Sequence, residues 1–230
     1  MASGSGASGH IHIGCGDPNI PEVNAEVFRP LATNHMTAST PTTGNQTFDN
    51  LYIPANRNPT FTGNVELRGV TYIEKPNKVQ FTGNCNITGV VATQDAGDNN
   101  YDTNTIKFTG NSRFYAPSAL PDLPQFTALK AMPGGSALLA PGFGLTFTGN
   151  FGTVAGWIAG DKFTFTGNVT GTFHGGIINY GDTEFKATGN ATLIFDRNDA
   201  SNHPDGFNIP PSPPTLSIKA NSYKEGFYEP

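Results

Sequence analysis

Residues 72–90 read YIEKPNKVQFTGNCNITGV, and the tetrapeptide Phe-Thr-Gly-Asn at residues 81–84 recurs along the chain. Further copies stand at residues 61–64, 108–111, 147–150 and 165–168, with variants at 42–45 and 187–190. The glycines of successive copies are 19, 20, 27, 39, 18 and 22 residues apart, so the basic period is about 20 residues. A unit this short cannot bury its own apolar face, so it must stack on its neighbours, as the repeats of a solenoid do.

The residue pattern within each repeat unit predicts two β-strands joined by a sharp corner. Val79 and Phe81 before the corner, and Cys85 and Ile87 after it, alternate with polar residues, which is the period of a strand. Glycine tolerates positive φ and asparagine also visits the left-handed region, so Gly-Asn suits the corner. We therefore predict an all-β fold, a single-stranded right-handed parallel β-helix of about seven turns with short helical insertions.

Stacking the units predicts two ladders along the solenoid. The motif phenylalanines would form an interior aromatic stack: Phe61, Phe81, Phe108, Phe147 and Phe165. The motif asparagines would pair their amides from turn to turn: Asn64, Asn84, Asn111, Asn150, Asn168 and Asn190.

The repeat also sets the domain organisation. Residues 1–9 are expected to be an added leader, residues 10–200 the β-helix, and residues 201–230 a Pro-rich C-terminal extension with a strand-like piece at 215–218. Insertions are expected near 21–31, 93–105 and 117–136. Apolar spacing and flanking prolines predict short helices over 21–31 and 123–132, lying against the solenoid or capping its end.

Composition excludes several classes of function. The formal net charge is −5 and only 13% of residues are charged, so nucleic acid is not an expected partner. No apolar run reaches the length of a membrane span, so no transmembrane helix is expected. The two cysteines, Cys15 and Cys85, are too few for a disulfide framework, and Cys85 is expected to be a small buried residue.

Two groups of residues are candidate metal ligands. Asp95, Asp98, Asn100 and Asp102, followed by Asn104, place oxygen-bearing side chains along one loop, which is chemistry that suits Ca²⁺. The loop lacks the glycine and the closing glutamate of an EF-hand, and an ordinary polar surface loop is the alternative. His10 and His12 place two imidazoles on one strand face, without a third ligand in sequence. No other cofactor is expected.

Two further functions are open. Parallel β-helices host polysaccharide lyases and glycoside hydrolases, which need clustered carboxylates or a base beside cations, but the charged residues of the repeats fall at different positions of the turn. Outward threonines beside the buried phenylalanines could match an ice lattice, as in β-helical antifreeze proteins. Their outer rank is broken at Gln80, Lys107 and Lys186.

The chain resembles the β-helical regions of bacterial pilus-assembly or pilin-like surface proteins. The resemblance rests on Phe-Thr-Gly-Asn, on the run at residues 72–81 and on Pro-Asn-Ile-Pro at 18–21. More loosely, the chain is similar to polymer-forming β-helical scaffold proteins. The resemblance implies an extracellular, non-catalytic part of such a protein and carries over no functional residues.

We therefore expect a non-enzymatic structural or adhesive domain at a bacterial cell surface. Its expected partners are proteins or carbohydrates at that surface. Because the ends of a solenoid are unpaired sheet edges, self-association through them is also expected.

Overall fold

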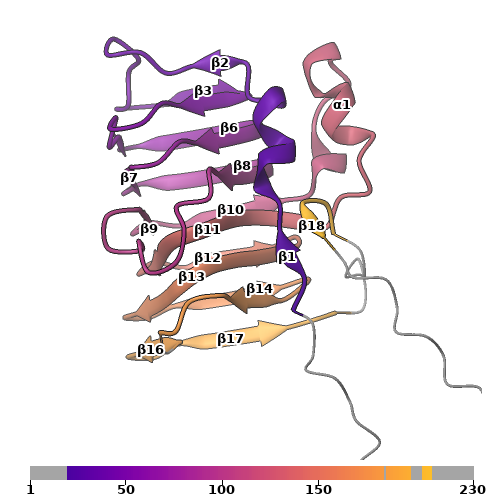
Figure 1. Ribbon diagram of the computed structural model, residues 1–230. Coiled ribbons are helices and arrows are strands. Elements are labelled where there is room, and N and C mark those ends of the chain that lie inside the picture. Colours follow the sequence, from indigo (N-terminus) through magenta and orange to yellow (C-terminus); the bar gives the residue numbers. More distant parts are fainter. Residues whose placement is uncertain (1–19, 184, 198–203, 209–230) are drawn as a thin grey trace, which may run out of the picture. The chain divides into compact units, whose positions relative to one another are not determined.

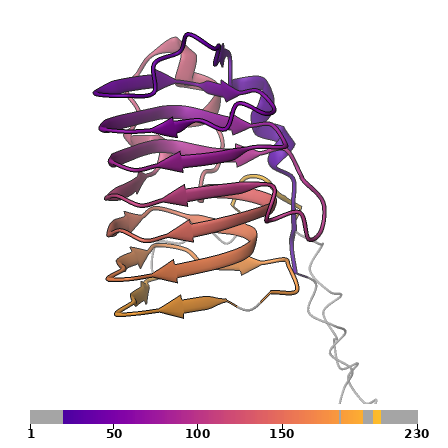
Figure 2. The same ribbon diagram turned by 90° about the vertical axis from the view of Figure 1, so that its left-hand side faces the viewer.

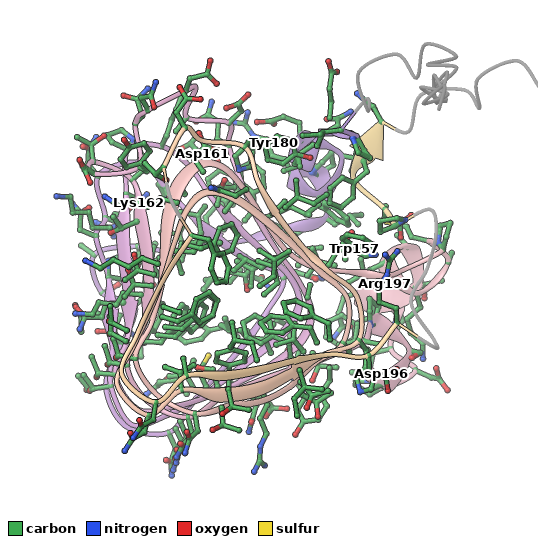
Figure 3. The ribbon with its side chains drawn as sticks, turned by 90° about the horizontal axis from the view of Figure 1, so that it is seen from below. Trp157, Asp161, Lys162, Tyr180, Asp196 and Arg197 are labelled. Carbon is green, nitrogen blue, oxygen red and sulfur yellow. The ribbon has the colours of Figure 1, made fainter. Side chains whose placement is uncertain are left out.

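The computed structural model describes residues 20–183, 185–197 and 204–208. Glu22–Asn208 form one compact unit, a parallel β-solenoid of about eight turns with about 20 residues per turn (Figures 1 and 2). The predicted all-β parallel solenoid is therefore confirmed. Its turns have three faces when seen along the axis (Figure 3). The leader at 1–9, His10, His12, Cys15 and the strand-like piece at 215–218 lie outside the described residues.

The first face carries the phenylalanine column. It consists of β5 (Thr60–Phe61), β7 (Lys78–Phe81), β9 (Thr105–Phe108), the second halves of β11 (Ser136–Phe147) and β13 (Trp157–Thr166), and β16 (Lys186–Thr188). Parallel pairing aligns the five motif phenylalanines. They are at most 1% exposed, and their rings stack at centroid distances of 5.0 to 5.2 Å. The interior aromatic stack is as predicted.

The second face follows the Gly-Asn corner. It consists of β3 (Gln46–Asp49), the first halves of β6 (Asn64–Ile73) and β8 (Asn84–Thr93), β10 (Ser112–Tyr115), β12 (Phe151–Val154), β14 (Thr170–Phe173) and β17 (Thr192–Phe195). Cys85 and Ile87 point into the core, whereas Asn84 and Asn86 are exposed. This alternation confirms the strand period expected after the corner.

The third face is covered on both sides. It consists of β2 (Asn34–His35), β4 (Leu51–Ile53), the second halves of β6 and β8, the first halves of β11 and β13, and β15 (Ile177–Asn179). The outer side chains of this face, among them Val70 and Tyr72, pack with Phe28, Phe126 and Leu129 of the inserted segments. Because these strands are covered on both sides from β4 to β13, nearly all of their residues on this face are buried, and their sequence here is mostly apolar.

The inserted helices lie against this third face. They are η1 (Ala25–Leu31), η2 (Pro117–Ala119), η3 (Pro124–Phe126) and α1 (Thr127–Lys130), the first three being 3₁₀-helices. Helices are thus present within both segments where they were predicted, but they are shorter. The first begins only at Ala25, because the preceding Glu22–Val23 forms a strand, β1. The insertion at 93–105 is a loop, with positive φ at Gly97 and Asn99.

Part of the predicted C-terminal extension packs beside the solenoid. β18 (Phe207–Asn208) pairs antiparallel with β1, and Phe207 packs against the cluster on the third face. The Gly134 N–H donates to Asp205 Oδ2 at 2.6 Å. Residues 204–208 therefore fold back along the solenoid and do not add a turn to it.

Candidate functional site

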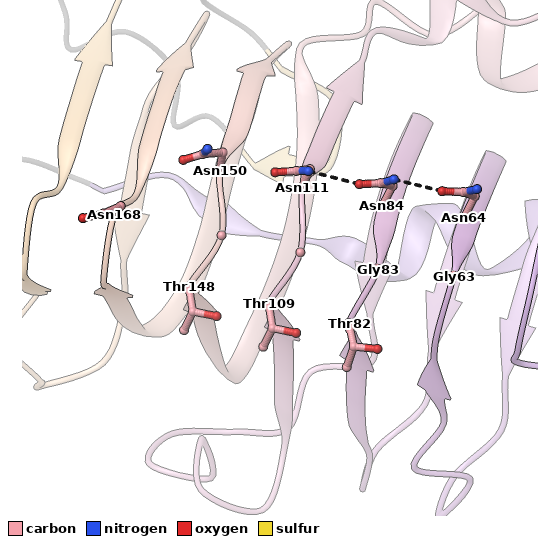
Figure 4. Close-up of a pocket in the computed structure, with 12 residues that line it drawn as sticks. Gly63, Asn64, Thr82, Gly83, Asn84, Thr109, Asn111, Thr148, Asn150 and Asn168 are labelled. Atoms are coloured by element: carbon pink, nitrogen blue, oxygen red, sulfur yellow. Dashed lines mark hydrogen bonds between the residues drawn. The ribbon is translucent and has the colours of Figure 1, made fainter.

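A polar strip runs along the Gly-Asn corner, from one turn to the next. Three columns form it, one each of threonine, glycine and asparagine. They border an open groove of about 610 Å³ (Figure 4). We call these columns the Thr-Gly-Asn strip, and the residues that line its groove are Gly63, Asn64, Thr82, Gly83, Asn84, Thr109, Gly110, Asn111, Thr148, Gly149, Asn150 and Asn168.

Glycine makes the floor of the groove because successive turns touch there. A Cβ added to Gly83 would lie 1.9 Å from the carbonyl oxygen of Gly63, and one added to Gly110 would lie 1.9 Å from that of Gly83. No side chain fits at such a distance from backbone atoms. The hollow between the threonine and asparagine columns is thus a direct result of the repeated glycine.

The asparagine ladder is present over part of the strip. Asn64 donates to Asn45 at 2.9 Å, Asn84 to Asn64 at 2.9 Å and Asn111 to Asn84 at 3.1 Å. A further bond joins Asn190 to Asn168 at 3.3 Å. Among the described residues, no bond links the Asn150 amide to Asn111 or Asn168, and Figure 4 shows Asn150 without a dashed line. The predicted ladder is therefore confirmed on both sides of Asn150 and interrupted at it.

The threonine hydroxyls bond to the preceding turn. Thr82 Oγ1 donates to Phe61 O and Thr109 Oγ1 to Phe81 O, both at 3.2 Å. Thr148 Oγ1 donates to Phe108 O at 3.4 Å. Since each hydroxyl hydrogen is engaged, the oxygens face the groove mainly as hydrogen-bond acceptors.

The outward-facing residues that directly precede the motif phenylalanines on the first face are not all threonine, as the sequence predicts. Pairing sets Thr60 beside Gln80, Gln80 beside Lys107, and Lys107 beside Thr146. Lys186 follows Thr164 further along. Only the motif threonines, such as Thr82, Thr109 and Thr148, form a regular column. A single column of threonines is a poor match to the two-dimensional lattice of an ice surface.

The predicted calcium loop does not converge on one point. The Asn100 amide donates to Ala96 O at 2.8 Å, within its own loop. Asp102 forms an exposed ion pair with Lys162 at 3.2 Å. Asp95 and Asp98 instead line a second pocket. In the part of the chain that the structure describes, no group of acidic or histidine side chains is arranged to hold a metal ion.

This second pocket gathers carboxylates from distant parts of the sequence. It has a volume of about 350 Å³. Its lining comprises Glu22, Val23, Asp95, Asp98, Pro141, Gly142, Asp161 and Tyr180. Asp161 and Tyr180 lie at the same corner of the solenoid (Figure 3). Asp161 carries no signal in the sequence, because an acidic residue inside an apolar strand has no period. Glu22 carries none because it lies far in sequence from the other pocket residues.

Asp161 is the most unusual group in this pocket. Its side chain is buried, with 3% of the residue exposed, and the Gly142 N–H donates to its Oδ1 at 2.8 Å. Burial raises the pKa of Asp161, and Asp98 and Asp95 add to this effect, while the Gly142 hydrogen bond opposes it. Burial also raises the pKa of Tyr180 to about 12, helped by Glu22 and Asp161.

Replacing Asp161 with asparagine is expected to stabilise the protein at neutral pH. A raised pKa means that the folded state holds a proton that the unfolded state has already lost, so stability falls as pH rises above the ordinary carboxyl range of about pH 4. Asp161→Asn keeps an acceptor for Gly142 and removes this penalty. Its Tm should exceed that of the wild type at pH 7, and the difference should disappear toward about pH 4.

Thermal melts across this pH range test the expectation. The matched control is Asp182→Asn, since Asp182 is exposed and should show no such difference. An Asp161→Asn Tm equal to or below the wild type at pH 7 would contradict the assigned burial penalty.

Comparisons with family models, curated proteins and solved structures give no match to this chain. No helix among residues 20–183, 185–197 and 204–208 is long and apolar enough to cross a membrane.

Proposed function

We propose that this chain is a non-enzymatic structural or adhesive domain of a bacterial cell-surface or pilus-associated protein. The observation that carries the proposal is the Thr-Gly-Asn strip, which presents the same uncharged groups on successive turns. A rigid surface of this kind suits contact with an extended partner better than chemistry at one point. The resemblance to β-helical regions of bacterial surface proteins supports an extracellular location.

Association through the ends of the solenoid belongs to the same proposal. The last described turns expose Phe185, Ile194 and Phe195. Exposed apolar residues at a strand edge favour association. An oligomer that forms through this end would agree with a role in assembly.

A carbohydrate-active enzyme is the second candidate, and the acidic pocket is the observation that favours it. Glycoside hydrolysis uses two carboxyl groups, one with a raised pKa that acts as the general acid. Asp161 has the raised pKa, and Asp95, Asp98 and Glu22 line the same pocket. An enzyme of this kind would depolymerise a polysaccharide, and Asp161→Asn would abolish the activity.

Cosedimentation with bacterial cell envelopes tests the adhesive proposal. The purified protein is expected to sediment with envelopes, and Asn150→Lys is expected to reduce binding strongly, because it places a charged side chain in the neutral groove. Asn86→Lys is the matched control, since Asn86 is equally an exposed asparagine but lies on the second face. It should bind as the wild type does.

The same assay separates the alternatives. Binding should be the same with and without added Ca²⁺, whereas calcium-dependent binding would shift attention to Asp95 and Asp98. Failure to bind any envelope preparation, equal binding by Asn150→Lys, or release of soluble sugars would each contradict the adhesive proposal.

A further inference from the structure

We propose that the Thr-Gly-Asn strip binds an uncharged, linear polysaccharide whose chain runs parallel to the solenoid axis. This inference rests on the adhesive function proposed above and names the partner of the same surface. Three features of the strip carry it: its repeat distance, its hydrogen-bonding groups and its lack of charge.

The repeat distance of the strip suits an extended sugar chain. The motif phenylalanine directly precedes the threonine of each turn, and the stacked phenylalanine rings are 5.0 to 5.2 Å apart. The strands that carry these rings pair in register from Phe61 to Phe165. Each turn therefore offers its threonine, glycine and asparagine with nearly the same translation. A sugar unit in an extended glycan has a similar length, so the spacing of the sugar units matches the spacing of the turns.

The hydrogen-bonding groups of the strip complement sugar hydroxyls. The oxygens of Thr82, Thr109 and Thr148 already donate their hydrogens to backbone carbonyls and so accept hydrogen bonds from a ligand. Asn64, Asn84 and Asn111 each use one N–H on the preceding asparagine, leaving a second N–H to donate. Donors on one side and acceptors on the other match hydroxyl groups, which both donate and accept.

Asn150 gives this surface a point of stronger recognition. Its amide takes no part in the asparagine ladder, which joins Asn111 to Asn84 and Asn190 to Asn168. The side chain is exposed beside the groove (Figure 4). Both the N–H groups and the oxygen of this amide are thus available to a ligand in the groove, between Asn111 and Asn168.

The absence of charge selects the class of polymer. All residues that line the groove are threonine, glycine or asparagine, and the chain has a formal net charge of −5. Uronate polymers and nucleic acids need cationic groups along their path, and this groove provides none. The groove is also hollow along its glycine floor, which suits a chain better than the flat surface of ice.

Binding to polysaccharides of defined charge and length tests the inference. The full chain is titrated with oligosaccharides from cellulose, chitin and mannan, and with oligogalacturonate as a charged comparison. Affinity for at least one neutral series should rise with chain length and level off near the length of the groove, which covers the turns from Asn64 to Asn168, about five sugar units. The charged series should not bind.

Variants locate the binding surface. Thr148→Val with Asn150→Ala removes two hydrogen-bonding groups from the strip and should weaken binding about tenfold or more. Thr153→Val with Asn86→Ala is the matched control, because both residues are exposed on the second face. The control should bind normally. Circular dichroism and Tm confirm that both proteins are folded.

The outcomes distinguish this inference from the function on which it rests. If envelopes bind through the strip but no neutral polysaccharide does, the inference is wrong and the adhesive proposal stands with a protein partner. Three other results would also overturn the inference: binding of oligogalacturonate, an equal loss of glycan affinity in the strip variant and in the control variant, or thermal hysteresis of ice growth without glycan binding. If neither envelopes nor glycans bind, both proposals fall.

Discussion

Phe108→Ala is expected to lower the free energy of unfolding by about 3–5 kcal/mol, as for a fully buried aromatic residue. Phe108 is 1% exposed. Its ring lies between those of Phe81 and Phe147, at centroid distances of 5.1 and 5.2 Å, and meets the edge of Phe114 at 5.5 Å. Truncation therefore removes apolar burial and leaves a cavity that the strand backbone on either side cannot close.

Chemical denaturation of wild type and variant measures this loss. Tyr115→Ala is the control, because Tyr115 lies on the neighbouring β10 but is 40% exposed. It should cost less than about 1 kcal/mol. Because each turn of a solenoid contacts only its neighbours, hydrogen exchange should show the greatest loss of protection in β7, β9 and β11. A cost below about 1 kcal/mol for Phe108→Ala would mean that the column contributes little.

Gly83→Ala is expected to destabilise the protein by about 3 kcal/mol or more, at the upper end for an overpacked site. The added methyl group would lie 1.9 Å from Gly63 O and 2.7 Å from the Gly63 carbonyl carbon. These are backbone atoms of the adjacent turn, so no side chain can rotate away to make room. The two turns must separate, which weakens the pairing of their strands.

Gly152→Ala provides the matched comparison. Gly152 lies on β12, the strand that directly follows the motif at 147–150. A Cβ added to it would meet only the Arg113 side chain, at 3.7 Å. We expect a change of at most about 0.5 kcal/mol there. Equal effects of the two substitutions on thermal or chemical unfolding would show that close contact between turns is not the reason for the repeated glycine.

The residues of the Thr-Gly-Asn strip could be predicted from the sequence, but the shape of its groove could not. Repetition of Phe-Thr-Gly-Asn is enough to predict buried phenylalanines and stacked asparagines. The hollow between the threonine and asparagine columns depends on how closely Gly63 and Gly83 approach. The interruption at Asn150 accompanies a change in strand register, since β10 and β12 pair with an irregularity between Ser112 and Phe114. No feature of the tetrapeptide itself indicates that change.

The acidic pocket shows where local patterns fail. Because they lie in one loop, Asp95, Asp98, Asn100 and Asp102 are candidate calcium ligands in the sequence, with an ordinary polar surface loop as the alternative. In the structure, Asp95 and Asp98 line a pocket with Asp161 and Glu22, while Asp102 pairs with Lys162. Which carboxylates lie together depends on the stacking of the turns and on β1, and neither is visible in the spacing of acidic residues.

The solenoid, its period, its corners and its aromatic interior can all be predicted from the amino-acid repeat. Those properties follow from interactions between equivalent positions of neighbouring turns, so a repeat of about 20 residues specifies them many times over. The folded chain is needed to see which outer surface the inserted helices cover, where the asparagine ladder is interrupted and which carboxylates share a pocket. Each of these depends on a contact between non-equivalent segments that occurs once, and a single contact leaves no repeated pattern in the sequence.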